Sequence, residues 1–125
     1  MRVLVVEDET KLAAIIRRGL RAAGHAADVA VRGQDALWMA GATEYSAIVL
    51  DLMLPDVDGL EVYRRLRAVP ATAGVPVIVL TARTAESTRD EARRLGVADY
   101  LNKPFDPDRL MDVMRRHAGG GGVVG

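Results

Sequence analysis

The fold of this chain follows from one stretch, Ile48-Val49-Leu50-Asp51-Leu52-Met53-Leu54-Pro55-Asp56-Val57-Asp58-Gly59. Its apolar start is typical of a strand buried on both faces, since such a strand needs no alternating polar residues. The run ends at one acid, Asp51, before a turn rich in Pro, Asp and Gly. Ligands bind at the carboxyl ends of strands in open α/β sheets, so Asp51 is the first candidate functional residue. The alternative is that Asp51 only caps the following turn or helix.

Similar apolar runs recur along the chain, separated by segments with helical spacing. We expect strands at 3–6, 27–31, 48–51, 77–80 and 97–101, and helices from 10 to 23, 33 to 42, 59 to 66, 85 to 95 and 106 to 117. Thr10 is expected to cap the first helix and Gly24 to end it, while Asp106 and Pro107 begin the last. Segment 70–76, with two Pro and one Gly, is predicted to be a loop.

Alternation of five strands with five helices predicts an α/β fold with a parallel sheet covered on both faces. The predicted domain spans residues 1–117. Residues 118–125 include four consecutive Gly and are expected to form a flexible tail or the start of a linker. The helix at 85–95 is polar nearly all round, so we expect it to pack weakly and to face solvent or a partner.

Composition excludes several classes of protein. The chain has 125 residues, half of them hydrophobic, with 17 basic and 17 acidic residues and no Cys. The absence of a basic surplus argues against direct nucleic-acid binding. Disulfides, thiolate catalysis and Cys-ligated zinc are excluded. No run approaches the roughly 20 apolar residues of a membrane span, and the apolar start is too short for a signal peptide. We therefore expect a cytoplasmic protein without a membrane partner.

Polar side chains follow four of the predicted strands, and parallel strands bring their carboxyl ends to one edge. They are Glu7, Asp8, Asp51, Thr81 and Lys103. Two carboxylates about 4 Å apart repel by on the order of 4 kcal/mol at an effective dielectric constant of 20. Three acids and one Lys sum to a charge of −2, which one Mg²⁺ ion neutralises while leaving coordination positions for phosphate oxygens. The pattern therefore predicts phosphoryl transfer to a carboxylate.

Each of these residues also has an ordinary structural interpretation. Glu7 and Asp8 are common helix-start acids, Thr81 is a common strand-end residue, and Lys103 alone would be a solvated surface lysine. Their arrival in order, at successive strand ends, favours the functional interpretation.

The chain resembles a response-regulator receiver domain of two-component signalling over residues 2 to 117. The matching stretches are Val5-Val6-Glu7-Asp8-Glu9, Leu50-Asp51-Leu52-Met53-Leu54-Pro55-Asp56, Asp58-Gly59, Leu80-Thr81-Ala82 and Asp99-Tyr100-Leu101-Asn102-Lys103-Pro104-Phe105. The resemblance implies a flavodoxin-like, doubly wound sheet with strand order 2-1-3-4-5, the order for which a member of this family is a standard example.

The resemblance also implies the role of each site residue. Asp51 would accept a phosphoryl group from a sensor histidine kinase. Asp8 and Asp51 would bind Mg²⁺ directly, with the Met53 carbonyl as a third ligand and Glu7 acting through water. The phosphoryl group would be contacted by Thr81 and Lys103.

Regulation is implied as well. Tyr100 would be a switch residue that turns inward when Thr81 moves toward the phosphate, and the Lys103–Pro104 peptide bond would be cis. The face formed by segments 85–95, 97–101 and 106–117 would then change and control an output. That output would be a C-terminal effector domain, a downstream protein or a phosphorylation-dependent homodimer. The domain would be a regulator that catalyses only its own phosphorylation and dephosphorylation, not an enzyme.

Some positions depart from the family's commoner patterns. Glu7 replaces an Asp, and the bulky Met53 and Arg83 are expected to slow attack of water on an aspartyl phosphate. Ala98, Arg109 and Val113 differ from the large winged-helix DNA-binding subfamily, which weakens the expectation of its charged dimer interface.

Two other functions remain as alternatives. An aspartate-nucleophile phosphohydrolase would place a second Asp two residues after the nucleophile, where this chain has Met53, which cannot donate a proton. A receiver-like protein-interaction module that is never phosphorylated would not need all five rim residues. The turn after the first strand is acidic and lacks Gly, which argues against a nucleotide-binding domain.

Overall fold

The apolar runs form five parallel strands in the computed structural model, which describes residues 1–82 and 86–119. The strands are β1 (Arg2–Val6), β2 (Ala26–Ala30), β3 (Ala47–Asp51), β4 (Val77–Thr81) and β5 (Asp99–Asn102). Their order in the sheet is β2-β1-β3-β4-β5, and every pair of neighbours is parallel. The predicted fold class and strand order are therefore confirmed.

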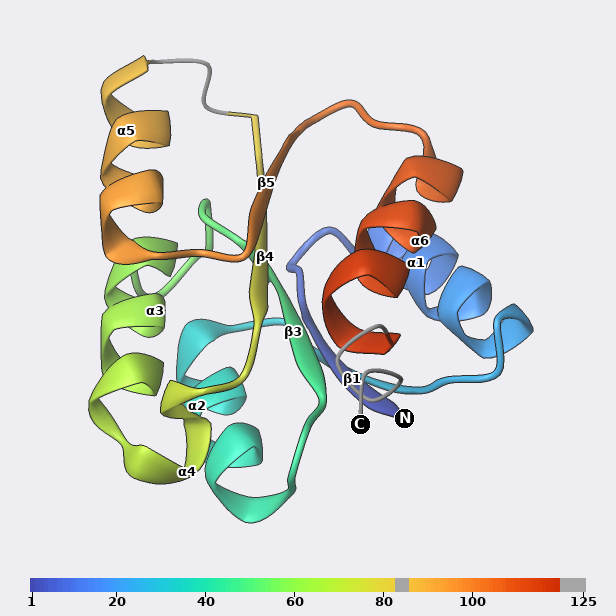
Figure 1. Ribbon diagram of the computed structural model, residues 1–125, viewed down its shortest axis with the longest axis horizontal. Helices are drawn as coiled ribbons and strands as arrows, with labels where there is room; N and C mark the ends of the chain where they lie inside the picture. The colour runs from blue at the N-terminus through green and yellow to red at the C-terminus, as the bar shows by residue number, and fades with distance from the viewer. Residues whose placement is uncertain (83–85, 120–125) are drawn as a thin grey trace.

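Helices cover both faces of the sheet (Figure 1). α1 (Thr10–Ala22) and α6 (Pro107–Met114) lie on one face, and a π-helical turn, η1 (Arg115–Gly119), follows α6. The other face carries α2 (Gly33–Ala42), α3 (Gly59–Ala68), α4 (Pro70–Ala73) and α5 (Glu86–Leu95). In the described part of the chain no helix is both long enough and apolar enough to cross a bilayer.

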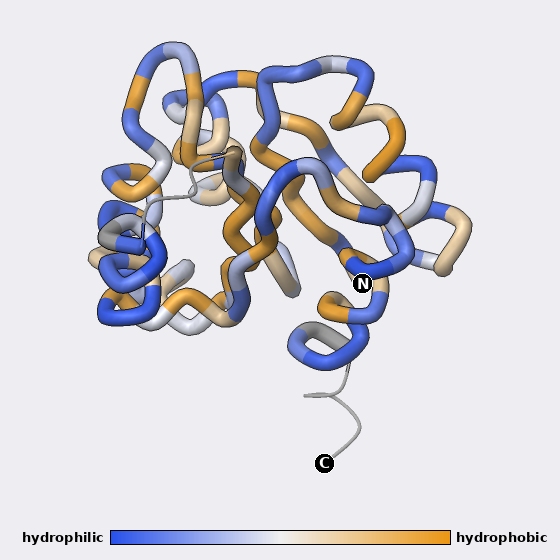
Figure 2. The backbone as a smooth tube through the Cα atoms, turned by 90° about the horizontal axis from the view of Figure 1, so that it is seen from above, coloured by the Kyte–Doolittle hydropathy of each residue, from blue (hydrophilic) through white to orange (hydrophobic). Residues whose placement is uncertain are grey.

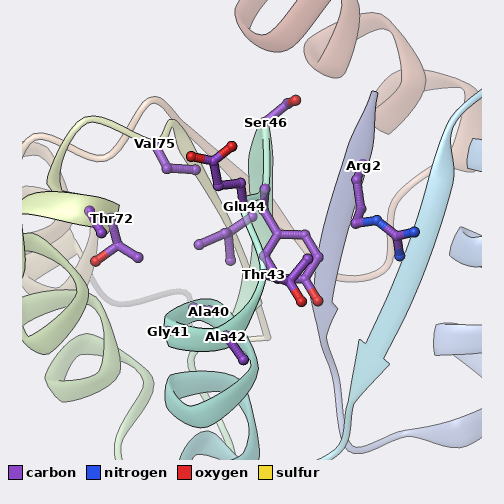
Figure 3. A pocket seen from close by; sticks show the side chains of 12 residues that line it. Arg2, Ala40, Gly41, Ala42, Thr43, Glu44, Ser46, Thr72 and Val75 are labelled. Carbon is purple, nitrogen blue, oxygen red and sulfur yellow. The ribbon is translucent and has the colours of Figure 1, made fainter.

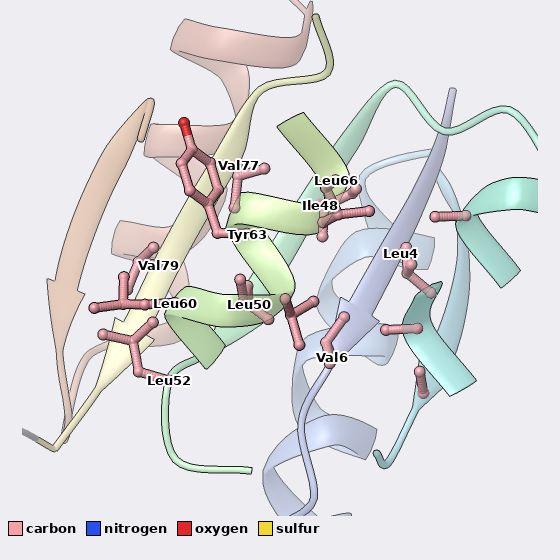
Figure 4. Close-up of a cluster of buried hydrophobic side chains, with 14 of the residues drawn as sticks. Leu4, Val6, Ile48, Leu50, Leu52, Leu60, Tyr63, Leu66, Val77 and Val79 are labelled. Atoms are coloured by element: carbon pink, nitrogen blue, oxygen red, sulfur yellow. The ribbon is translucent and has the colours of Figure 1, made fainter. Parts of the chain in front are cut away.

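Alternate residues of the strands supply two hydrophobic cores, since successive side chains point to opposite faces. In β1, Leu4 and Val6 pack with residues of α2 and α3, whereas Val3 and Val5 pack with residues of α1 and α6. Figure 4 shows the first core, in which Leu60 and Tyr63 of α3 lie over the central strands. The hydrophobic residues in Figure 2 are concentrated along the strands in the middle of the molecule.

The prediction of five helices was wrong by one, because α4 forms a single turn within the segment expected to be a loop. Pro70 at its first turn suits a helix start, where no N–H donor is needed. Thr72 is buried, and its hydroxyl donates to the carbonyl oxygen of Leu66 at 2.5 Å. This side-chain bond ties α4 to the end of α3, a contact that composition does not reveal.

Several predicted boundaries also shift. Thr10 is not the cap of α1 but its first residue; the cap is Glu9, whose side chain makes no capping bond. β2 lies one residue earlier than predicted, and β5 begins at Asp99 rather than at 97. Residues 97 and 98 instead follow the α5 C-terminus, where Val97 N–H bonds back to the Ala92 carbonyl.

Other predicted helix ends are confirmed. Gly24 follows α1 with φ +92°, and the Asp106 side chain accepts from Asp108 N–H at the start of α6. Helical structure continues through η1 to Gly119, so the domain boundary at 117 remains a prediction. Residues 120–125, the rest of the predicted tail, and Ala85, the predicted start of α5, lie outside the described residues.

Gly59 allows α3 to start directly against the end of β3. A Cβ at this position would lie 2.4 Å from the Leu52 Cα and 2.6 Å from the Asp51 carbonyl oxygen. Both contacts are with backbone, which cannot move aside as a side-chain tip can. The close approach is held by a 3.0 Å bond from Gly59 N–H to the Leu52 carbonyl.

We expect Gly59→Ala to lower the free energy of unfolding by at least about 2 kcal/mol, since overpacking against a rigid backbone costs roughly 1–3 kcal/mol or more. Urea denaturation measures the change. Gly41→Ala is the matched control, because a Cβ there meets nothing within 4 Å and Ala gains up to about 1 kcal/mol over Gly in a helix. Equal stability of Gly59→Ala and the unmodified protein would show that the backbone can relax.

Asp28 on the edge strand β2 binds two side chains. Its Oδ2 lies 2.8 Å from both the Tyr45 hydroxyl and Arg2 Nη1. These contacts, the Tyr45 hydrogen bond above all, outweigh partial burial and lower the pKa of Asp28. Burial and the neighbouring Asp28 carboxylate raise the pKa of Tyr45 to about 12.

Because the folded state depresses the pKa of Asp28, its contribution is present above the unfolded value and is lost as the pH falls through the folded value. We therefore expect Asp28→Asn to destabilise the protein at neutral pH by no more than about 1 kcal/mol. The difference should shrink as the pH falls below the ordinary Asp pKa of about 3.9 and disappear once the pH is below the lowered pKa of the folded state. Urea titrations over this pH range test it, with the exposed Glu44→Gln as control. A constant difference at all pH values would contradict the assignment.

Candidate functional site

Parallel pairing brings the predicted site residues to one edge of the sheet, here called the carboxyl-end rim. Asp51 is the last residue of β3 and pairs with Leu80, while Thr81 is the last residue of β4 and pairs with Asn102. Glu7 follows β1 directly, and Lys103 follows β5. The rim therefore gathers residues that lie up to 96 positions apart, from Glu7 to Lys103.

Three carboxylates converge on this rim. One oxygen from each of Glu7, Asp8 and Asp51 lies within 4.8 Å of the others. Glu7 is fully buried and Asp51 is 2% exposed, whereas Asp8 faces solvent. The site is thus open on the Asp8 side and enclosed by protein on the other.

The Lys103 ammonium lies among these acids. Its Nζ is 2.7 Å from Glu7 Oε1 and 3.0 Å from Asp51 Oδ2, with Glu9 Oε2 at 3.8 Å. The ammonium is therefore paired with both buried acids, and Glu7 Oε1 has no second polar partner in the described part of the chain. The Lys103 N–H donates to the Thr81 carbonyl, and the Lys103–Pro104 peptide bond is cis.

Burial and ion pairing oppose each other in setting the pKa values of Glu7 and Lys103. Burial raises the pKa of Glu7 to about 7, against the opposing contacts with Lys103 and the Glu9 N–H, and the nearby Asp51 adds to the rise. Burial alone would lower the pKa of Lys103, but its contacts with Glu7 and Asp51 outweigh this and raise it. The protein therefore keeps a cation here at neutral pH and places excess negative charge beside it.

The donor set fits a hard divalent cation. Oxygen ligands from one or two carboxylates, with room for water, are what Mg²⁺ prefers. The three acids and Lys103 sum to −2 when all are charged, so one ammonium does not balance the carboxylates that converge here. A bound cation would relieve the repulsion between these carboxylates.

Residue 53 lies beside the Asp51 carboxylate. The Met53 N–H donates to Asp51 Oδ1 at 2.9 Å, and the Met53 side chain is 52% exposed. This bond fixes the Asp51 carboxylate relative to the loop that follows β3. The predicted roles of Met53 and of the other site residues remain proposals, and Arg83 lies outside the described residues.

Thr81 and Tyr100 occupy adjacent strands near the rim. Thr81 is fully buried at the end of β4, and Tyr100 is half-buried on β5. The Arg89 guanidinium of α5 lies over the Tyr100 ring, 5.4 Å from its centroid, and donates to Asn102 Oδ1 at 2.6 Å. The surface side of Tyr100 thus contacts α5.

The sequence did not predict the contacts of two residues near the site, Asp56 and Arg89. Asp56 accepts from the N–H groups of Gly33 and Gln34 at 2.8 and 3.0 Å, so the loop after β3 caps α2. Arg89 holds Tyr100 and Asn102 as described above. The helix that follows Asp56 is capped by Asp58 instead, and the partners of Asp56 are 22 and 23 residues away, so no local pattern marks it. Arg89 is one of several Arg residues on a polar helix, and nothing distinguishes it.

A family model for the response regulator receiver domain matches residues 3–115. The chain belongs to the response-regulator receiver family. It is 43% identical over 115 residues to the transcriptional regulatory protein TcrA of Mycobacterium tuberculosis, covering 92% of this chain and 45% of TcrA. It is 41% identical to the transcriptional regulatory protein CusR of Escherichia coli, covering 92% of this chain and 50% of CusR. The receiver spans about half the length of these curated relatives.

Solved structures agree with this assignment. The receiver domain of the sensor histidine kinase PA1611 from Pseudomonas aeruginosa, described with a magnesium ion in its active-site cleft, superposes with a TM-score of 0.85 at 33% identity. The match covers 94% of this chain and 97% of that one. A CheY-like receiver domain from Methanospirillum hungatei has a TM-score of 0.91 over 99% of this chain and 98% of that one, at 20% identity, which shows the shared fold.

A separate cavity of about 400 Å³ lies at the amino ends of the strands, across the sheet from the carboxyl-end rim (Figure 3). Its lining includes Arg2 at the start of β1, Ser46 just before β3 and Val75 just before β4. None of the predicted site residues lines it. Its position at the amino ends of the strands separates it from the rim.

We expect Mg²⁺ to stabilise the receiver and Asp8→Asn to remove most of that effect, since Asp8 is the exposed member of the carboxylate cluster. At about ten times its dissociation constant, a ligand that binds only the folded state adds about 1.4 kcal/mol. Thermal unfolding with and without Mg²⁺ measures this, each variant being compared with itself. Asp112→Asn, an exposed change on α6, should keep the full shift. An equal Mg²⁺ shift in Asp8→Asn would remove Asp8 from the site.

Proposed function

We propose that this receiver is a phosphorylation-dependent signalling switch in which Asp51 accepts a phosphoryl group from a sensor histidine kinase. The observation that carries the proposal is the contact of the Asp51 carboxylate with Lys103 Nζ at 3.0 Å inside a cluster of two further acids. A carboxylate so placed has a cation beside it, and the neighbouring Asp8 opens the cluster to solvent.

The proposed transfer is a displacement at phosphorus. An Asp51 oxygen forms the new bond to phosphorus as the bond to the histidine nitrogen breaks, and that nitrogen keeps the electron pair. Mg²⁺ would be held by Asp8 and Asp51, with the Met53 carbonyl and with Glu7 through water, and would supply charge neutralisation. Lys103 would stabilise charge on the phosphoryl oxygens, and Thr81 would donate its hydroxyl to one of them.

The proposed switch links the phosphate to the surface. Movement of Thr81 toward the phosphoryl group would free space beside β4, and Tyr100 would turn inward from its contact with Arg89. That would shift the population of arrangements of α5, β5 and α6. Because α5 has few apolar residues, a small free-energy difference can move it.

The proposed partners of the receiver follow from the phosphoryl transfer and from the length of the related proteins. A sensor histidine kinase would phosphorylate the receiver in the cytoplasm, and an effector domain, a downstream protein or a second receiver would respond. The relatives named as transcriptional regulators are about twice as long as this chain, which favours an attached effector. The proposed role is regulatory, with no substrate turned over beyond its own aspartyl phosphate.

The two alternatives make different demands on the site. A phosphohydrolase needs a general acid two residues after the nucleophile, and Met53 cannot serve. A receiver-like module that is never phosphorylated needs neither the partly buried Lys103 nor the buried acids Glu7 and Asp51, because such charges cost free energy without a function to keep them. Turnover of a phosphate monoester would revive the first alternative.

We expect Asp51→Asn to abolish labelling by acetyl phosphate in the presence of Mg²⁺, because the amide nitrogen and oxygen lack the nucleophilicity of the carboxylate. Intact-mass spectrometry detects the added phosphoryl group. Circular dichroism should show an unchanged fold, since the amide has nearly the shape of the carboxylate.

Asp112→Asn serves as the control and should be labelled like the unmodified protein. Labelling of Asp51→Asn at the same level would contradict Asp51 as the acceptor. Absence of labelling in the unmodified protein, with Mg²⁺ present and the fold intact, would favour the unphosphorylated module instead.

A further inference from the structure

Met53 is the most exposed of the sulfur-containing side chains. The chain has five Met and no Cys, so thioethers are the only sulfur groups that an oxidant can attack. Met53 is 52% exposed, compared with 37% for Met1. Met114 is buried, and Met39 and Met111 are packed against the two hydrophobic cores. Because an oxidant must reach the sulfur from solvent, we expect Met53 to react first.

The backbone holds Met53 beside the carboxylate cluster. Its N–H donates to Asp51 Oδ1 at 2.9 Å, and an Asp51 oxygen lies within 4.8 Å of one oxygen each of Glu7 and Asp8. The Met side chain is unbranched and has three rotatable bonds, and here more than half of it faces solvent. Its sulfur can therefore approach the cluster from the solvent side.

Oxidation would change the kind of ligand that this side chain offers. A thioether sulfur is a soft donor that suits Cu(I), whereas Mg²⁺ takes hard oxygen ligands. Conversion to the sulfoxide gives the same side chain a polar S–O group, whose oxygen carries partial negative charge while the group stays neutral. It would add a hard oxygen donor to a cluster of three carboxylates without adding to their excess of negative charge.

We propose that Met53 is an oxidation site and that its sulfoxide tightens the binding of Mg²⁺ at the carboxyl-end rim. The inference rests on the proposed function for the cation site, and it deepens that function by naming a modification that regulates the site. Because the proposed phosphoryl transfer uses Mg²⁺, an oxidant would join the kinase in controlling the receiver.

The oxidation transfers one oxygen atom and two electrons. A lone pair on the Met53 sulfur attacks one oxygen of hydrogen peroxide, and the S–O bond forms as the O–O bond breaks. The hydroxide that leaves takes up the proton of the transferred oxygen, so the products are the sulfoxide and water. Sulfur loses two electrons and the peroxide gains them. Methionine sulfoxide reductases return such groups to the thioether.

The first experiment maps the oxidation. The receiver is treated with a graded series of hydrogen peroxide concentrations, and peptide mass spectrometry measures the fraction of sulfoxide at each Met. We expect sulfoxide at Met53 to appear at the lowest peroxide concentration and at the buried Met114 only at the highest. Oxidation of Met53 no faster than that of Met114 would overturn the proposal.

The second experiment measures the affinity for Mg²⁺ by isothermal titration calorimetry before and after peroxide treatment. We expect the oxidised receiver to bind Mg²⁺ at least about threefold more tightly, since groups around a metal site commonly change its affinity by about tenfold or more. Met53→Leu is the matched control, because Leu has nearly the volume of Met and no sulfur. Its affinity should be the same before and after treatment.

Met53→Gln tests the oxygen donor without any oxidant. Its amide oxygen stands on an unbranched side chain of similar length, so we expect Met53→Gln to bind Mg²⁺ more tightly than Met53→Leu does. An equal gain on peroxide treatment of Met53→Leu would assign the effect to another Met and overturn the proposal. An unchanged or weaker affinity in the oxidised receiver, or equal affinities of the Gln and Leu variants, would also overturn it.

Labelling by acetyl phosphate separates the two hypotheses. A receiver that is labelled but whose Mg²⁺ affinity does not change on oxidation overturns only the role of Met53. A receiver that binds Mg²⁺ more tightly after oxidation but is never labelled overturns only the proposed phosphoryl transfer. Absence of Mg²⁺ binding both before and after treatment would overturn the role of Met53, whatever the labelling.

Discussion

The structure depends on one partly buried cation shared by two buried carboxylates. Lys103 Nζ lies within 3.0 Å of both Glu7 and Asp51, and these three groups come from three separate strand ends. Charges removed from water cost several kcal/mol each unless they are paired, so the ion pairs are a condition for burying any of them. The pairing leaves an excess of negative charge at Asp8, the exposed member of the carboxylate cluster, where the site is open to solvent.

Rigid backbone contacts hold this arrangement in place. Asp51 is fixed by the Met53 N–H, and the helix after it approaches so closely that residue 59 has no room for a Cβ. Asp56 in the same loop ties α2 to the rim. The centre of the sheet, β1, β3 and β4, is buried on both faces, and its packing fixes the carboxylates to within a narrow range of positions.

The β5 edge of the sheet is held differently. α5 contributes few apolar side chains, with Ala92 fully buried, and is attached through polar contacts: Arg64 with Glu91 at 2.5 Å, and the Tyr63 hydroxyl with the Leu95 carbonyl at 2.9 Å. Exposed ion pairs of this kind contribute about 1 kcal/mol or less. A tightly packed site therefore adjoins a helix, α5, that is attached by weaker contacts. A chemical change at the site can shift such a helix without disrupting the packed centre of the sheet. The Arg89 contact with Tyr100 lies where the two regions meet.

The sequence by itself determined the parallel α/β fold and the residues of the rim. Apolar runs such as 48–51 and 77–80 predict buried strands, and parallel strands must finish at the same edge, so Glu7, Asp51, Thr81 and Lys103 could be expected to converge. Only the tertiary structure decided the contacts between distant segments: the capping of α2 by Asp56, the turn α4 held by Thr72, and Arg89 over Tyr100. The physical reason is that periodicity reports which face of an element is buried, a property of neighbouring residues. Which polar group meets which depends on how whole elements pack, and no local pattern records that.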